Sequence, residues 1–300
     1  MPHVLSLIAG SQKSPLLTKH INAACKLMEK LGAELDTGQW LHEKTAWQVE
    51  FDRKPSNALQ AMRTAAARWP VDVNMVPTAN QRKKLLIADM DSTMIEQECI
   101  DELADAAGAG EAVKAITVRA MNGELEFEDA LRERVAALKG LPSGVIGEVI
   151  ATRITFMSGG RDLIATMRQN NAYCALISGG FTHFTAYVGA ELGFHEHQAN
   201  ELIIKENLLT GEVASPVLGR DAKVAALKRI SDTFGFSVDE AIAVGDGAND
   251  VPMLQAAGMG VALHAKPVVK QHVDVQIDHG DLTGLLYLQG FTRDEFARHH

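Results

Sequence analysis

The sequence has few cysteines and no long apolar run, and each absence excludes a class of protein. Its 300 residues contain three cysteines, Cys25, Cys99 and Cys174, without a CxxC spacing, which argues against a disulfide framework or a zinc site. No apolar stretch approaches the length of a membrane span. The VLSLIAG segment near the start is too short for a signal peptide and lacks its basic flank. We therefore expect a cytoplasmic protein with reduced thiols and no membrane partner.

Positive charge is also scarce. The formal net charge is −9 and no block of Lys and Arg interrupts the chain, which argues against nucleic acid as a partner. An anionic substrate must then be attracted by local positive groups or by a metal ion. The apolar fraction of 46% is typical of globular proteins, and the length suits one large domain or two modest ones. We assign no function to the terminal residues His299 and His300, which could be native or part of a tag.

Residues 1–79 have a pattern of their own. Apolar or alternating runs predict strands at 3–10, 46–51 and 71–76, with another strand and a turn between 32 and 44. Apolar residues at helical spacing predict one helix ended by Gly32 and a second, carrying Leu59, Met62 and Trp69, ended by Pro70. The order β-α-β-β-α-β is the ferredoxin-like plan, an α+β arrangement. The polar segment 77–84 is the predicted linker.

From residue 84 onward, strands alternate with helices, which predicts an α/β fold with a parallel sheet. The candidate strands are 85–89, 173–178, 241–246, 259–263 and 274–277. The first two are separated by far more helical sequence than a crossover needs. We therefore expect a helical insertion at about 94–158, above the carboxyl end of the first strand. Residues 201–213 predict an antiparallel hairpin.

Two pairs of aspartates follow two of the predicted strands. Asp89 and Asp91 come after the first apolar run, and Asp246 and Asp250 come after a later one. Open α/β sheets bind ligands at the carboxyl ends of their strands, so these acids could form a site for Mg²⁺ beside a phosphate. Aspartate is also common wherever strands end in turns, and Asp250 fits a helix N-cap, so we expect it to act as a cap and an outer metal ligand.

The closely spaced acids Asp89 and Asp91 suit a two-step phosphoryl transfer. A carboxylate that stays ionised beside a divalent cation can attack phosphorus and form an aspartyl-phosphate. A shielded neighbour can hold a proton near neutral pH and deliver it to a leaving alkoxide. A role limited to metal binding, without covalent chemistry, is the main alternative.

Basic and small residues offer weaker signals. Ser178 and Gly179, at the end of the second strand, could wrap phosphate oxygens in a backbone nest, although such a sequence is more often a plain loop. Lys223 lies near a helix start, where a cation opposes the helix dipole. The residues alone do not select it over the neighbouring basic side chains of Arg220, Lys228 and Arg229.

Two further groups of polar residues have an ordinary interpretation on sequence alone. Glu98 and the pair Arg132 and Arg134 are typical of solvated helix faces. His195 and His197 alternate as metal ligands do, but they lack further spaced partners, so we expect exposed loop residues there.

The motifs DMDST, ISGG, DAK and GDGAND, in this order and spacing, resemble those of the haloacid dehalogenase superfamily. The segments DMDSTMIEQECIDELADAAG and MNGELEFEDALRERVAALKGLP resemble the phosphoserine phosphatases within it, over about residues 85–290. The N-terminal region resembles the ACT-like domain often fused to bacterial members. The resemblance implies an ACT-like domain at 1–79 and, at 80–300, a Rossmann-like phosphatase domain with a helical cap at about 94–158.

The resemblance implies a role for each matching residue. Asp89 would be the nucleophile and Asp91 the general acid and later the base. Mg²⁺ would be held by Asp89, the main-chain carbonyl of Asp91, and Asp246, with Asp250 in support. The other implied positions are the phosphate-binding Ser178 and Gly179, the charge-neutralising Lys223 and the loop residue Asn249.

In the cap, the family recognises an amino acid with a Glu and an Arg, which fall on Glu98 and Arg134. A carboxylate suits the ammonium group of the substrate, and a guanidinium suits its carboxylate. Arg132 is a near alternative to Arg134.

The implied activity is Mg²⁺-dependent hydrolysis of O-phospho-L-serine to L-serine and phosphate, the last step of serine biosynthesis. Superfamily phosphatases and mutases keep the second acid, which dehalogenases and P-type ATPases lack, and a cap suited to an amino acid disfavours a mutase. One alternative is a phosphotransferase acting on homoserine or another alcohol. The other is an amino-acid sensor that works through the ACT-like domain. A homodimer is a candidate assembly.

Overall fold

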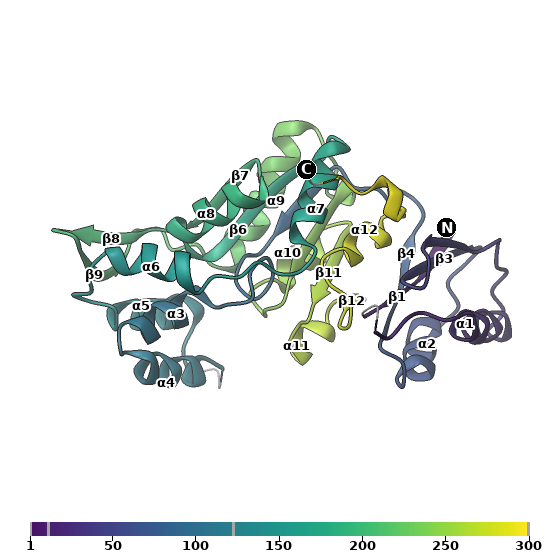
Figure 1. Cartoon of the computed structure of the whole chain (residues 1–300), viewed down its shortest axis with the longest axis horizontal. Helices are drawn as coiled ribbons and strands as arrows, with labels where there is room; N and C mark the ends of the chain where they lie inside the picture. The colour runs from purple at the N-terminus through teal and green to yellow at the C-terminus, as the bar shows by residue number, and fades with distance from the viewer. Residues whose placement is uncertain (1, 11–12, 122–123, 299–300) are drawn as a thin grey trace.

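In the computed structural model, which describes residues 2–10, 13–121 and 124–298, the strands form three β-sheets. A four-stranded antiparallel sheet comes first, a six-stranded parallel sheet lies at the centre, and a two-stranded hairpin extends from it (Figure 1). No helix in this described part of the chain is long and apolar enough to cross a membrane. His299 and His300 lie outside the described residues.

The first sheet has the predicted ferredoxin-like plan, with the strand order β2-β3-β1-β4. Its elements are β1 (His3–Ala9), α1 (Thr18–Lys30), β2 (Gln39–His42), β3 (Ala46–Phe51), α2 (Ala58–Ala66) and β4 (Val71–Pro77). Helix α2 ends earlier than expected, so Trp69 lies beyond it and stacks on His20. The following Pro70 disfavours helical conformation at Trp69, which accounts for the early end.

Both faces of this sheet are buried, because successive side chains of a strand point to opposite faces. Leu5 and Leu7 of β1 pack with α1 and α2 in one core cluster. Val4 and Ile8 belong to the core of the central sheet instead, and β1 contacts α12 (Gly284–Leu288) there. The N-terminal unit is thus packed against the rest of the molecule through its sheet.

The central sheet is parallel throughout, with the order β12-β11-β10-β5-β6-β7. Its strands are β5 (Leu85–Ala88), β6 (Tyr173–Phe181), β7 (Glu196–Asn200), β10 (Ala241–Gly245), β11 (Met259–Leu263) and β12 (Val275–Ile277). The predicted α/β class and the five predicted strands are confirmed. Strand β7 was missed, because a polar edge strand carries little apolar periodicity.

His195 and His197 lie at this missed strand. Both are exposed as expected, and His195 lies in a bend directly before β7, but the expected loop is wrong for His197, which lies within β7. His195 Nδ1 accepts a hydrogen bond from the backbone amide of Cys174, and His197 Nδ1 lies 3.0 Å from the Thr185 hydroxyl. These bonds give both rings a structural role at the sheet edge.

Helices cover both faces of the central sheet, as in a doubly wound fold. In β5, Leu86 and Ala88 face the core shared with α7, α8 and α12, whereas Leu85 and Ile87 face α9 and α10. The covering elements are α7 (Gly160–Gln169), α8 (Thr182–Leu192), α9 (Arg220–Phe234), η1 (Val238–Glu240), α10 (Val251–Ala256), α11 (Pro267–Lys270) and η2 (Arg293–Glu295).

Four helices separate β5 from α7: α3 (Cys99–Ala106), α4 (Gly110–Met121), α5 (Phe127–Ala136) and α6 (Gly144–Thr152). The predicted hairpin is confirmed as β8 (Leu202–Lys205) and β9 (Leu208–Val213), and β9 packs on α5. Figure 1 shows these helices and the hairpin at one end of the molecule and the N-terminal unit at the other. We call α3–α6 the helical insertion; the exact domain boundaries stay a prediction.

Candidate active site

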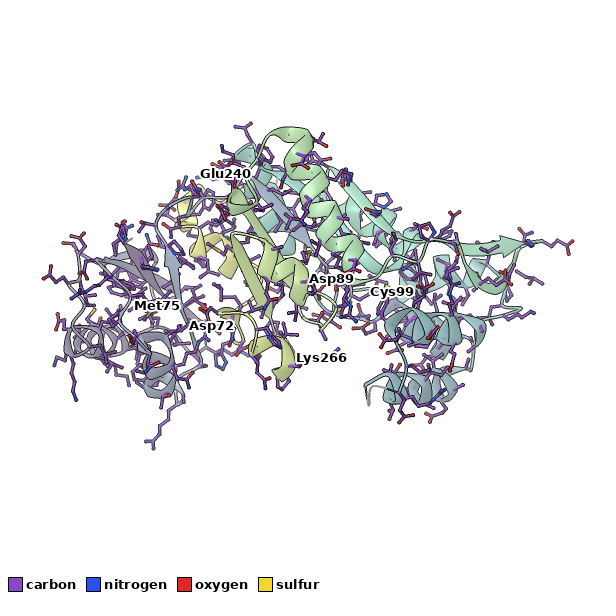
Figure 2. All side chains as sticks on the ribbon, turned by 180° about the vertical axis from the view of Figure 1, so that it is seen from behind. Asp72, Met75, Asp89, Cys99, Glu240 and Lys266 are labelled. Carbon is purple, nitrogen blue, oxygen red and sulfur yellow. The ribbon has the colours of Figure 1, made fainter. Side chains whose placement is uncertain are left out.

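The carboxyl ends of the adjacent strands β5 and β10 bring three aspartates together. The backbone amide of Asp89 donates to the Val244 carbonyl at 3.0 Å, which aligns the two strand ends. Asp89, Asp246 and Asp250 each offer one carboxylate oxygen, and these atoms lie within 4.8 Å of one another. All three side chains are buried, and Figure 2 shows Asp89 near the middle of the molecule.

Burial and mutual repulsion make this cluster unfavourable without a cation. Burial, followed by the charge of Asp250, raises the pKa of Asp89 well above its usual range. Burial, with the charges of Asp250 and Glu98, raises the pKa of Asp246 to about 6. Carboxylate oxygens are the donors that hard divalent cations prefer, so the three aspartates fit such an ion.

Lys223, in the first turn of α9, is the buried cation of the cluster, with only 2% of its surface exposed. Its Nζ lies 2.7 Å from Asp89 Oδ1 and 2.5 Å from Asp250 Oδ1. Burial favours the neutral amine, but the two carboxylates outweigh it and raise the pKa of Lys223, so the ammonium persists. The other basic candidates on α9 are exposed, so the fold selects Lys223 among the four.

Asp250 corrects one expectation from the sequence. It occupies the residue before α10, but among the described residues 245–256 its side chain forms no capping hydrogen bond. Its Oδ2 accepts the Gly247 amide at 3.0 Å instead, while Oδ1 pairs with Lys223. A buried ammonium attracts a carboxylate more strongly than a neutral amide does, which explains the change of partner. Asn249 is half-buried in the same loop.

Asp91 is half-buried beside the acid cluster, and its carboxylate accepts hydrogen bonds from a backbone amide and a hydroxyl group. Its Oδ1 accepts the Cys99 amide at 2.8 Å, and its Oδ2 accepts the Ser178 hydroxyl at 3.3 Å. Burial, followed by the charge of Glu98, raises the pKa of Asp91 to about 6. A carboxyl group with this pKa can hold or accept a proton near neutral pH, as general acid–base catalysis requires.

The last part of β6, which carries Ser178 and Gly180, faces Asp91 closely, and the pairing of β6 with β7 is irregular there. The Gly180 amide donates to Ser178 Oγ at 2.8 Å, which fixes the hydroxyl of this buried serine. A Cβ atom at Gly180 would lie 2.6 Å from Asp91 Oδ2, so a side chain there would displace the acid. The glycine is therefore required by close approach.

Asn200, at the end of β7, holds this part of β6 in place, and the sequence did not indicate this role. Its Nδ2 donates to the Gly179 carbonyl at 2.9 Å, and its Oδ1 accepts the Leu218 amide at 2.7 Å. The side chain is buried and links the last part of β6 to the segment before α9. An asparagine at the end of a polar run gives no signal of this role, because both partners are distant in the chain.

The helical insertion supplies Glu98 and Arg134 above the site. Glu98 directly precedes α3, and its Oε1 accepts the Ser92 hydroxyl at 2.8 Å. Arg134 on α5 is half-buried; burial lowers its pKa, while the charges of Asp101, Glu98 and Asp91 oppose that shift. Arg134 therefore lies within electrostatic reach of both Glu98 and Asp91.

Arg132 is excluded as the inward-facing arginine. Its side chain is exposed, and its Nη2 lies 2.6 Å from Glu128 Oε1, one helical turn earlier on α5. Arg132 therefore forms an ion pair on the outer surface of α5, whereas Arg134 is half-buried near the site. The inner one, Arg134, is the arginine that the family resemblance placed in the substrate-binding role, with Arg132 as its alternative.

Phe127, the first residue of α5, is a second residue that the sequence analysis missed. A Cβ atom at Gly179 would lie 3.0 Å from Phe127 Cζ, and one at Gly219 would lie 3.4 Å from Phe127 Cδ1. The ring thus covers the last part of β6 and the segment before α9. An apolar cover of this kind excludes water from the groups beneath it.

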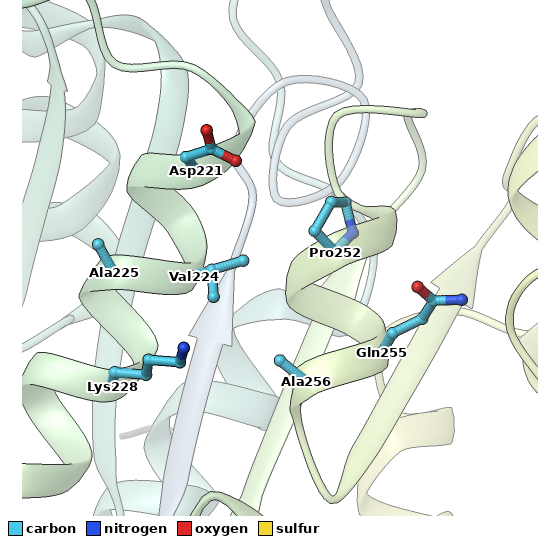
Figure 3. A pocket seen from close by; sticks show the side chains of 7 residues that line it. All are labelled: Asp221, Val224, Ala225, Lys228, Pro252, Gln255 and Ala256. Atoms are coloured by element: carbon cyan, nitrogen blue, oxygen red, sulfur yellow. The ribbon is translucent and has the colours of Figure 1, made fainter.

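A groove of about 620 Å³ lies between α9 and α10, beside the acid cluster rather than in it (Figure 3). It is lined by Asp221, Val224, Ala225, Lys228, Pro252, Gln255 and Ala256. None of these described lining residues belongs to the candidate site. The groove runs along α9, whose first turn carries Lys223, and along α10, which Asp250 directly precedes.

Comparisons with known proteins agree with this geometry. The family model for haloacid dehalogenase-like hydrolases matches residues 86–255. The chain is 40% identical over 235 residues to a phosphoserine phosphatase of Archaeoglobus fulgidus, covering 78% of this chain and 68% of that protein. It is also 40% identical over 237 residues to phosphoserine phosphatase SerB2 of Mycobacterium tuberculosis; this match covers 78% of the chain but only 58% of that longer protein.

A solved structure extends the similarity to nearly the whole chain. The crystal structure of a probable phosphoserine phosphatase from Vibrio cholerae, in its unliganded form, has a TM-score of 0.78 and 29% sequence identity. The match covers 97% of this chain and 88% of that one, so it includes the N-terminal unit as well as the central sheet.

Proposed function

This chain belongs to the haloacid dehalogenase-like hydrolases, and we propose that it hydrolyses O-phospho-L-serine to L-serine and phosphate through an aspartyl-phosphate. The observation that carries the proposal is the pairing of Asp89 with the buried ammonium of Lys223, next to a carboxyl group suited to proton transfer. In this role the enzyme catalyses the last step of serine biosynthesis. Its three free cysteines suit the reducing cytoplasm.

We propose Mg²⁺ as the divalent cation. Asp89, Asp246 and the main-chain carbonyl of Asp91 would hold it, with Asp250 in support. The clustered carboxylates support this assignment, because Mg²⁺ prefers hard oxygen donors. When bound, the ion offsets negative charge and polarises the phosphoryl group.

In the first chemical step, a carboxylate oxygen of Asp89 attacks phosphorus and the bond from phosphorus to the serine oxygen breaks. Lys223 favours the ionised form of Asp89 by direct contact, which opposes the effect of burial. Asp91 donates its proton to the departing serine oxygen. Ser178, the Gly179 amide, Lys223 and Asn249 would bind the phosphoryl oxygens in this step.

In the second step, Asp91 acts as a base, because it became a carboxylate when it gave up its proton in the first step. It takes a proton from a water molecule, whose oxygen attacks the phosphorus of the aspartyl-phosphate. The bond between phosphorus and Asp89 breaks, which releases phosphate and restores both acids. The hydroxyl of Ser178 already contacts Asp91, so the acid is held next to the phosphoryl site.

The helical insertion gives the site its preference for an amino acid. Glu98 would bind the ammonium group of the substrate, and Arg134 would bind its carboxylate through a forked pair of hydrogen bonds. The half-buried position of Arg134 supports this role, since partial desolvation strengthens a charged hydrogen bond. Phe127 would close the site above the phosphoryl group.

A phosphate-release assay over phosphorylated amino acids and sugars, with and without Mg²⁺, tests the proposal. We expect Mg²⁺-dependent release from O-phospho-L-serine at the highest kcat/KM of the panel. A preference for a sugar phosphate would contradict it. Including homoserine and analysing the products identifies a phosphotransferase, because the phosphoryl group would then appear on the alcohol.

Two expectations about the whole protein stay predictions. Amino-acid sensing as the sole role is disfavoured, because the chain keeps the acidic and basic groups that hydrolysis needs. Titration of the full chain with serine, using an Asp89→Asn variant to avoid turnover, tests whether the N-terminal unit also binds a ligand. Sedimentation tests the expected homodimer.

A further inference from the structure

The N-terminal sheet joins the central sheet through side chains of its edge strand β4. The Asn74 amide Nδ2 donates to the Gln276 carbonyl at 2.8 Å, and Asn74 Oδ1 accepts the Gln276 amide at 2.8 Å. Arg63 Nη2 braces the pair, because it donates to Asn74 Oδ1 at 3.1 Å and to the Asp274 carbonyl. A buried side chain thus occupies the free edge of β12, where a further strand would otherwise pair.

Asp72 extends this junction beyond the end of β12. It lies two residues before Asn74, on the same face of β4, and only 4% of its surface is exposed. Its Oδ1 accepts the amides of Asp278 at 2.7 Å and His279 at 3.0 Å, and its Oδ2 accepts the amide of Gly280 at 2.8 Å. Figure 2 shows Asp72 where the N-terminal unit meets the rest of the molecule. One buried carboxylate therefore holds three consecutive amides.

The loop that Asp72 holds continues to the base of the helical insertion. Asp281 Oδ2 accepts the Ser158 hydroxyl at 2.7 Å, and the Leu282 amide donates to the Ser158 carbonyl at 3.1 Å. The preceding residue, Met157, donates its amide to the Met94 carbonyl at 3.0 Å. Met94 lies between β5 and α3, and Met157 lies between α6 and α7, so the two residues belong to the segments that flank the helical insertion. Hydrogen bonds thus run from the N-terminal unit to both ends of the insertion.

The contact at this base is tight. A Cβ atom at Gly159 would lie 2.6 Å from the Thr283 amide nitrogen, and Gly159 has a φ of 79°, in the left-handed region. There is therefore no free space next to Ser158 into which residues 281–283 could shift without moving their neighbours. Movement of the loop must instead move the segment that carries the insertion.

We propose that Asp72 is a positioning residue for substrate recognition: by fixing residues 278–280, it holds the base of the insertion that carries Glu98 and Arg134. The part of this inference that concerns selectivity for O-phospho-L-serine rests on the proposed function. Asp72 acts through the backbone and touches no reacting group. The N-terminal unit then contributes to amino-acid recognition although it lies at the far end of the molecule from the insertion (Figure 1).

The test compares Asp72→Asn with Asp52→Asn in the full chain. An amide at position 72 presents a donor to backbone amides that are themselves donors, so part of the junction is lost. We expect kcat/KM for O-phospho-L-serine to fall about tenfold. The value for p-nitrophenyl phosphate, which lacks the amino-acid groups, should stay within about twofold of the wild type. Asp52 is an exposed carboxylate of the same unit that accepts the Glu34 amide, and its variant should match the wild type on both substrates.

Hydrogen exchange gives a readout that does not depend on activity. In Asp72→Asn, the amides of residues 278–280 and of residues 157–159 should both exchange faster. Faster exchange at 278–280 with unchanged exchange at 157–159 would overturn the inference, as would equal losses on the two substrates. If the wild type fails to hydrolyse O-phospho-L-serine, the proposed function fails, and the exchange pattern still decides the structural link.

A second variant guards against misfolding of the first. Ser158→Ala removes the bond to Asp281 at an exposed position and leaves the contacts of Asp72 intact. It should reproduce the selective loss on O-phospho-L-serine. Wild-type selectivity in a folded Ser158→Ala variant would contradict the proposed path.

Discussion

Lys223 and Asp250 form a buried ion pair in which Nζ lies 2.5 Å from Oδ1, and the same ammonium contacts Asp89 at 2.7 Å. One cation is therefore shared by two carboxylates, while Asp246 lies close by. The cluster keeps an excess of negative charge that a divalent ion would offset. This relationship connects the basic helix α9 to the strand ends and underlies the predictions that follow.

Replacing Lys223 by Met should remove both catalysis and stability. The two carboxylates would be left buried without their partner, so we expect the free energy of unfolding to fall by about 3 kcal/mol. Turnover should fall by at least about a hundredfold, because the proposed contact of the ammonium group with the phosphoryl oxygens is lost. Phosphate release and urea denaturation measure the two effects. Lys228→Met, on the exposed side of α9, is the matched control and should leave both near the wild type.

Arg134→Ala and Arg132→Ala should differ sharply. Loss of the inner arginine should raise KM for O-phospho-L-serine by about tenfold to a hundredfold, the equivalent of a lost charged hydrogen bond, and should affect p-nitrophenyl phosphate much less. The outer arginine pairs with Glu128 on the surface, so its variant should be unchanged. Equal losses on the two substrates in Arg134→Ala would contradict a role in binding the substrate carboxylate.

Asp89→Asn should abolish turnover and leave the fold intact, because it removes the proposed nucleophile and relieves repulsion from Asp250. Mg²⁺ at about a hundred times its dissociation constant should stabilise the wild type by about 2.7 kcal/mol, and the variant by clearly less. Thermal unfolding with Mg²⁺ and with a chelator measures this difference. Appreciable hydrolysis by the variant would remove covalent catalysis from the mechanism.

Without metal, stability should depend on pH through Asp246. Burial, with the charges of Asp250 and Glu98, raises its pKa from 3.8 to about 6. A raised carboxyl pKa stabilises the folded state fully below the unfolded pKa, and this contribution is lost as pH rises through about 6. With a chelator present, the free energy of unfolding should lose on the order of 3 kcal/mol from this group between about pH 4 and pH 7. Urea denaturation at several pH values gives the free energy of unfolding of the wild type and of Asp246→Asn. The wild type should lose stability relative to the variant as the pH rises from about 4 to 7. A constant difference between the two proteins over this range would exclude Asp246 as the cause.

Asn200→Ala should weaken the hold on the part of β6 that carries Ser178. Three hydrogen bonds of this buried side chain are lost and the Gly179 carbonyl loses this partner, so the free energy of unfolding should fall by about 2 kcal/mol. We also expect a reduced kcat, since this part of β6 would no longer be held against the segment before α9. Gln198→Ala, two residues earlier on the same strand, is the control in both assays. Unchanged kcat in a destabilised Asn200→Ala would limit this residue to a structural role.

Local pattern was enough to place the acids. Asp89 and Asp246 each follow a short apolar run, and such a run bounded by turn-forming residues is typical of a buried strand. Since parallel strands end at one edge, the meeting of these two side chains follows from periodicity together with the α/β alternation. The order and spacing of the motifs added the family and the identity of the helical insertion.

Packing between distant segments selected the rest. Lys223 and Lys228 share one helix, as do Arg132 and Arg134, and only the rotation of each helix against its neighbours determines which side chain faces the site. Asn200, Phe127 and Asp72 act on partners that are far away in the chain, so their local sequence resembles any edge strand or helix start. The physical reason is that strand and helix periods are short-range properties, whereas a contact depends on how whole elements are brought together.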